Sequence, residues 1–182
     1  MMRLMGLASL ALMAAPVAAQ DMSAFTTGPV IEDFGPHAPV AGMAAIPEDA
    51  RFAIAFDVSA PAAEGSANRG FESAARFLNM AVAAGVPEEN IKLAVVVHGR
   101  AGMELLTNAA HGVHPASRKG DNPSAGLVEA LLDKGVRFIL CGQTTAAYSI
   151  APDDLIDGVE VWLSAITAHA LLQQQGYTVN PF

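Results

Sequence analysis

The pattern of apolar residues changes at Arg51, where short apolar runs begin to alternate with longer amphipathic segments. The runs at 52–58, 91–97 and 136–140 are too short for helices and predict buried strands. Apolar residues at helical spacing predict helices over 70–84, 123–134 and 164–175. Strands alternating with helices of this length are typical of parallel βαβ units. We therefore expect an α/β fold: one three-layer α/β/α domain with a mostly parallel sheet.

The remaining segments are shorter and fill the connections. Residues 101–108 and 144–149 predict short helices, whereas 109–122, broken by two glycines and a proline, predicts a loop. A short apolar piece at 159–163 and a last short strand at 177–179 complete the pattern. The expected domain thus spans 51–182.

Residues 1–19 have the three parts of a secretory signal peptide: Arg3, an apolar segment at 4–15 and the small residues Val17-Ala18-Ala19. The apolar segment is too short to span a bilayer, and a retained membrane anchor is the alternative. We expect an exported, periplasmic protein with no membrane contact after cleavage. Residues 20–50 are rich in proline and glycine and predict an extended arm, which lies over the domain or reaches a neighbouring subunit.

Composition narrows the possible partners. The chain has 10 Lys and Arg residues against 18 Asp and Glu residues, and cleavage after residue 19 would remove Arg3 and bring the net charge near −9. This balance argues against a nucleic-acid surface and against adsorption to anionic lipid. The sequence contains neither GxGxxG after the first strand nor GxxxxGK[ST], so nucleotide binding has no support, and we expect no cofactor.

Cys141 is the only cysteine, and it lies where the strand at 136–140 meets a predicted helix start. Unpaired amides at a helix N-terminus favour the thiolate over the thiol. An isolated cysteine cannot form an internal disulfide, although the exported compartment would permit one. The alternative interpretation is a buried cysteine that acts as a small apolar residue.

Two further polar residues lie at predicted strand ends: Asp57 near the end of the first strand and His98 after the second. Ligands of open parallel sheets bind at the carboxyl ends of the strands. We therefore expect His98 to assist Cys141 as a base or electrostatic partner. The alternative for His98 is a ring that caps the next helix or packs under the loop, and the alternative for Asp57 is a carboxylate that caps local amides. The candidate ligand-binding residues are Asp57, Asn79, Gly99, Gly142, Gln143 and Thr144. For Asn79, a solvent-facing position is the alternative.

Two loop histidines, His111 and His114, are spaced i, i+3. On a helix that spacing could hold a metal, but the flanking Gly112 and Pro115 favour a loop. We therefore expect no metal site. A site made by His98, Cys141 and one loop histidine remains an alternative.

The chain resembles the DsrE/DsrF-like family from Arg51 to its carboxyl end. Four segments carry the resemblance: Phe77-Leu78-Asn79, Val95-Val96-Val97-His98-Gly99, Leu140-Cys141-Gly142-Gln143 and Leu172-Gln173-Gln174-Gln175-Gly176-Tyr177. It implies a parallel sheet of about five strands and assembly into dimers, trimers or hexamers. For some members it implies sulfur relay, in which a cysteine at a strand end carries sulfane sulfur as a persulfide. The position matching that cysteine is Cys141.

The leading hypothesis is an exported protein that binds or carries sulfane sulfur, or another small sulfur species, on Cys141. The amides of residues 142–145 would stabilise the charge, and a sulfur donor or acceptor protein would be a partner. The rival is a non-catalytic oligomeric binding or accessory protein in which Cys141 is a packed pocket residue. The apolar last helix and the segment 177–182 predict a homo-oligomer, because exposed apolar patches usually mark interfaces. Whether the protein is an enzyme stays open at this point.

Overall fold

The computed structural model describes residues 21–180, and the predicted signal peptide lies outside the described residues. The strands are β1 (Phe52–Val58), β2 (Ile91–Val97), β3 (Arg137–Cys141), β4 (Glu160–Trp162) and β5 (Thr178–Asn180). The α-helices are α1 (Arg69–Ala83), α2 (Asn108–Val113), α3 (Ala125–Asp133), α4 (Gly142–Tyr148) and α5 (Ala165–Gln174). The described residues also form the 3₁₀ helices η1 (Glu88–Asn90), η2 (Gly99–Leu105) and η3 (Pro152–Asp154).

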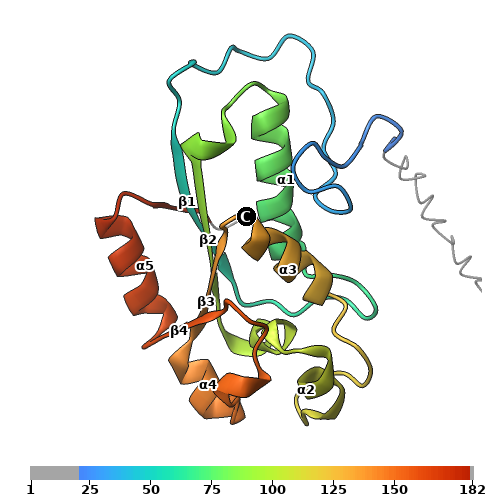
Figure 1. Ribbon diagram of the computed structural model, residues 1–182, viewed down its shortest axis with the longest axis vertical. Helices are drawn as coiled ribbons and strands as arrows, with labels where there is room; N and C mark the ends of the chain where they lie inside the picture. Colours follow the sequence, from blue (N-terminus) through green and yellow to red (C-terminus); the bar gives the residue numbers. More distant parts are fainter. Residues whose placement is uncertain (1–20, 181–182) are drawn as a thin grey trace, which may run out of the picture.

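The five strands form one sheet in the order β4-β3-β2-β1-β5, and every adjacent pair is parallel. Figure 1 shows the sheet nearly edge-on, with α1 and α3 on one side and α5 on the other. The expected three-layer α/β/α architecture is therefore confirmed, with five strands.

The face under α1 and α3 holds the larger core. β1 sends Ile54, Phe56 and Val58 to this face, and they join the buried side chains of α1 and α3 in one cluster. Phe71 of α1 and Phe138 of β3, both with no exposed surface, meet edge to face with their ring centroids 5.1 Å apart. Aromatic pairs favour this geometry, and it fixes α1 against the middle of the sheet.

The face under α5 is built from smaller side chains. Ala55, Ala94, Val96 and Ile139 pack against Ala168 and Leu172 of α5. Around this small cluster several large apolar side chains stay exposed in the single chain. They are Val161, Leu163, Ile166, Leu171 and Val179, with Ile166 exposed by 84%.

The connections differ from the prediction in three places. The helix expected at 101–108 is the 3₁₀ helix η2, which ends before Leu106 because that residue is extended and bridged to Leu155. The loop expected at 109–122 contains α2, whose first turn is capped by the Thr107 hydroxyl. The helix expected at 144–149 begins two residues earlier, at Gly142, because Cys141 occupies the cap position itself.

The arm before β1 contains no helix or strand in its described part, and it lies against α1 before crossing the amino-terminal edge of the sheet (Figure 1). Val30 and Ile31 are buried there. The arm thus lies over its own domain. Within residues 21–180, no helix is long and apolar enough for a membrane span.

Candidate functional site

The ends of β1, β2 and β3 bring Asp57, His98 and Cys141 to one edge of the sheet. Asp57 alternates with Phe56 and therefore lies on the α5 face, like Ala55. Val97 pairs with Leu140 across β2 and β3, so the next residues, His98 and Cys141, lie opposite each other. Adjacent strands are about 4.8 Å apart, which places the two side chains on neighbouring strand ends.

Cys141 is the N-cap residue of α4, and its side chain lies where α4 and α5 begin. The amide N–H groups of Thr144 and Gln143 come from the first turn of α4, and that of Ala165 is the first of α5. Burial raises the pKa of the Cys141 thiol, but hydrogen bonds from these amides and from the Thr144 hydroxyl outweigh burial and lower it. A lowered thiol pKa increases the thiolate fraction near neutral pH. Cys141 is 6% exposed.

Gly142 and Gln143 hold the start of α5 beside the thiol. A Cβ atom at Gly142 would lie 2.8 Å from the Trp162 carbonyl oxygen and 3.2 Å from that of Leu163, so only glycine allows this approach. The side-chain amide of Gln143 donates to the Leu163 carbonyl oxygen at 3.2 Å. These two predicted ligand-binding residues thus position the connection between β4 and α5.

Thr144 and Gly99 are joined to each other. The Gly99 amide donates to the Thr144 hydroxyl oxygen at 3.0 Å, and Gly99 has a φ of +58°, in the left-handed region that favours glycine. This bond fixes the turn after His98 against α4. The Gly99 N–H is therefore used within the protein, and Thr144 acts on both the turn and the thiol.

Asp57 pairs with two histidines. His169 Nε2 lies 2.8 Å from Asp57 Oδ1, and His98 Nε2 lies 3.3 Å from Asp57 Oδ2. Burial opposes ionisation of Asp57, but the hydrogen bonds from His169 and His98 outweigh it and lower the pKa of the carboxyl. An ionised carboxylate only accepts hydrogen bonds, so each histidine carries a proton on Nε2. In the neutral form of the His98 ring, the free lone pair is therefore on Nδ1.

His169 is the site residue that the sequence did not reveal. It lies within an apolar helix, where its simplest interpretation is a core or interface histidine, and it reaches Asp57 only because α5 packs across the ends of the central strands. Its Nδ1 atom is buried and has no hydrogen-bond partner within the described residues. That environment favours the tautomer with hydrogen on Nε2, which is the one that Asp57 requires.

Asn79 does not lie at the site. Its side chain is fully buried and accepts hydrogen bonds from the amides of Val30 and Ile31 at 3.1 and 2.8 Å. Its amide group donates to carbonyl oxygens of the arm, including that of Phe34 at 2.9 Å. Because both ends of the amide are used in this way, Asn79 anchors the arm to α1.

The side chains of the two loop histidines are hydrogen-bonded to backbone carbonyl groups. His111 Nδ1 donates to the Gly120 carbonyl oxygen and His114 Nε2 to that of Tyr148, each at 2.9 Å. In the part of the chain that the structure describes, no group of three or more His, Cys, Asp or Glu side chains is arranged to hold a metal ion.

Comparison with known proteins gives one family match. A model of the DsrE/DsrF-like family matches residues 50–181. The protein of unknown function MTH1491 from Methanobacterium thermoautotrophicum is 20% identical, with 72% of this chain and 99% of that chain covered and a TM-score of 0.49. The ychN protein from E. coli is 26% identical, with 72% and 100% covered and a TM-score of 0.46. No curated protein matches the chain.

Proposed function

This chain belongs to the DsrE/DsrF-like family, and we propose that it carries sulfane sulfur as a persulfide on Cys141. Membership of the family suggests a role of the sulfur-relay type. The observation that supports the finer proposal is the thiol whose pKa is lowered by amides from the first turns of both α4 and α5. Two helix N-termini provide positive charge where a persulfide anion would form.

The transfer is a displacement at sulfur. The Cys141 thiolate attacks the outer sulfur of a donor persulfide, the donor's S–S bond breaks, and the donor leaves as a thiolate while Cys141 becomes a persulfide anion. An acceptor thiolate then attacks the outer sulfur of that persulfide and releases the Cys141 thiolate. No external oxidant or reductant is needed, because one thiolate and one persulfide are exchanged in each step.

His98 would accept the proton when Cys141 is present as the thiol. The Asp57 carboxylate holds His98 through Nε2, which leaves Nδ1 as the basic atom. His169 donates a hydrogen bond to the other oxygen of the same carboxylate. Asp57 and His169 would therefore act as positioning residues, and His98 as the proton acceptor on the strand end next to that of Cys141.

A second candidate is supported by the low exposure of the thiol, at 6% in the single chain. In this alternative the protein is a non-catalytic binding or accessory protein, and Cys141 is a packed pocket residue. The two candidates differ in how quickly the native thiol reacts.

The experiment is intact-protein mass spectrometry after incubation with thiosulfate, tetrathionate or polysulfide, with Cys141→Ser as the control. A carrier gains one or more sulfur atoms or a thiosulfonate adduct, reductant reverses the gain, and the variant shows none. A protein that stays unmodified, and whose cysteine resists alkylation until unfolding, supports the accessory role. Cys141→Ser should keep its fold, and unfolding of that variant would also support the packing role.

Self-association is part of the proposal. Large apolar side chains of β4, α5 and β5 are exposed around the face of the sheet that α5 covers. A second copy of the chain could bury them. Light scattering at micromolar concentration should give an oligomer for the unmodified chain and a smaller species for Ile166→Glu. A monomeric unmodified chain would contradict this part.

Export to the periplasm is proposed from residues 1–19. Fractionation of cells that express the full chain should place it in the periplasm, shortened by the length of the signal peptide. Full-length protein in the cytoplasm would contradict export without affecting the sulfur chemistry.

A further inference from the structure

A large cavity lies away from the cysteine in the part of the chain that the structure describes. A cavity of about 620 Å³ lies between the segment 61–66, η2 and the segment 116–123. None of Asp57, His98 and Cys141 lines it. Its position after β1 and β2 is at the carboxyl end of the sheet, where open parallel sheets bind ligands, and its volume is within the range of small-molecule sites.

The acidic group in this cavity is satisfied by the protein. Glu104 is 6% exposed, and its two carboxylate oxygens accept hydrogen bonds from the Ala62 amide and the Asn68 side chain. Burial raises the pKa of Glu104, against the effect of these bonds and of the Arg118 charge. Glu104 thus holds the segment that begins at Ala62 and has no oxygen left without a donor.

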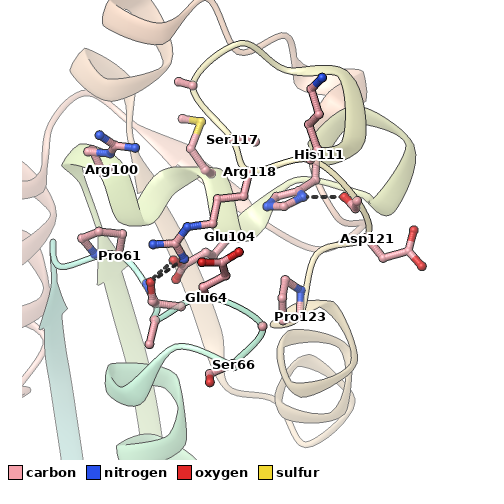
Figure 2. A pocket seen from close by; sticks show the side chains of 17 residues that line it. Pro61, Glu64, Ser66, Arg100, Glu104, His111, Ser117, Arg118, Asp121 and Pro123 are labelled. Atoms are coloured by element: carbon pink, nitrogen blue, oxygen red, sulfur yellow. Dashed lines mark hydrogen bonds between the residues drawn. The ribbon is translucent and has the colours of Figure 1, made fainter.

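The cationic side chains that line the cavity, in contrast, are not paired with carboxylates in the described part of the chain. Arg118 donates through Nη1 to the Ala62 carbonyl oxygen at 2.8 Å, which uses one of its five N–H groups. Within residues 21–180, no carboxylate lies at ion-pair distance from Arg118, Arg100 or Lys119. Figure 2 shows the Arg118 side chain across the middle of the cavity, with the His111 ring directed inward and Asp121 outward.

We propose that this cavity binds a small organic carboxylate with an apolar body. The carboxylate would take the free N–H groups of Arg118 in the paired geometry that guanidinium groups favour, with Arg100 adding charge. Pro61, Met103 and Ala116 provide apolar wall for the body. This inference concerns a site separate from Cys141 and does not depend on the sulfur-carrier function.

Glu64 also lines the cavity, and its exposed carboxylate acts against an anion. It provides a test of the sign of the ligand charge. If the ligand is an anion, Glu64→Gln should strengthen binding by roughly twofold to fivefold, as expected for an exposed charge. If the ligand is a cation, the same variant should weaken binding.

The experiment is an NMR titration of the ¹⁵N-labelled protein with three probes. Naphthalene-2-carboxylate has the expected charge and body, 2-naphthylmethylamine has the same rings with a positive charge, and acetate has the charge without the rings. We expect saturable shifts from naphthalene-2-carboxylate at amides of 62–66, 100–104 and 116–121, and at least about tenfold weaker binding of the other two probes.

Arg118→Gln should weaken naphthalene-2-carboxylate binding by about 10- to 100-fold, since it removes a charge-assisted contact. Arg100→Gln is the second variant, because the Arg100 side chain is exposed and makes no hydrogen bond within the described residues, so the substitution should not disturb the fold. It should weaken binding by a few fold. Equal binding of the amine, shifts confined to β4 and α5, or full affinity in both arginine variants would overturn the proposal.

Discussion

The two faces of the sheet are covered very differently. On one face, α1, α3, η2 and the arm bury a large cluster that includes the Phe71 and Phe138 pair. On the other face, α5 alone covers a small cluster of mostly short side chains, and Ile166 on that helix is 84% exposed.

The difference separates the larger core from the candidate site in this domain. Asp57, His98, Cys141 and His169 all lie on the thinly covered face, whose buried apolar cluster is small. The densely packed face provides most of the apolar burial, which is the dominant favourable contribution to folding. The same face also exposes Leu163 and Ile166, which are 70% and 84% exposed.

The largest expected difference between the faces is in core energetics. Phe71→Ala should lower the free energy of unfolding by about 3–5 kcal/mol, because it leaves a cavity under Phe138. Ile166→Ala should change it by no more than about 0.5 kcal/mol, because the side chain is exposed. Urea unfolding of dilute, monomeric protein measures both. Similar losses in the two variants would mean that the faces do not differ as described.

The arm should contribute to the stability of the fold through its hydrogen bonds with Asn79. Asn79→Ala leaves the buried Val30 and Ile31 amides without their acceptor and should lower the free energy of unfolding by about 1–3 kcal/mol. Limited proteolysis should then cut the arm before the domain. Asn90→Ala is the matched control, because Asn90 accepts an exposed hydrogen bond from Arg51. An arm that stays protected in Asn79→Ala would show that other contacts hold it.

On the thin face, Thr144 should control the reactivity of the thiol. The lowered pKa of Cys141 predicts that native alkylation reaches its plateau at lower pH than alkylation of unfolded chain. Thr144→Val removes one hydrogen bond to the thiol and should move the native profile to higher pH. Thr145→Val is the control, because the Thr145 hydroxyl donates to the Gly142 carbonyl oxygen instead. Identical pH profiles of alkylation for both variants would show that the Thr144 hydroxyl does not lower the pKa of the thiol.

The same lowered pKa also affects stability. A folded state that binds its thiol proton more weakly than the unfolded state gains stability as the pH rises through the folded pKa, and the gain is complete above the unfolded pKa. Cys141→Ser should abolish this dependence. A stability difference between the two proteins that stays constant from pH 6 to about pH 10 would contradict it.

The smallest effect is expected at Asp57. Its lowered pKa means that it stabilises the fold above its unfolded pKa, and this stability is lost as the pH falls through the folded pKa. Because Asp57 is over a third exposed, Asp57→Asn should lower the free energy of unfolding at pH 6 by about 1 kcal/mol or less. Unfolding curves of both proteins at pH 3 and pH 6 measure this loss of stability. A larger loss at pH 3 than at pH 6 would contradict the lowered pKa of Asp57.

Much of the fold could be predicted from the sequence, because apolar periodicity reports which segments are buried on one side or on both. The three central strands and the main helices follow from that pattern. Parallel strands end at one edge, so the common location of Asp57, His98 and Cys141 also follows. The start of α4 was missed by two residues, because a cysteine is not a typical capping residue.

Only the tertiary structure decided which further segments meet these strand ends. β4 pairs with β3 and α5 returns over the central strands, and this brings the Ala165 amide to the thiol and His169 to Asp57. Packing across the whole chain likewise directs Asn79 to the arm and opens the cavity beside Arg118. Local sequence determines how each segment is buried, whereas contacts between segments far apart in the chain depend on the order of the strands. That order is set by the packing of all segments together.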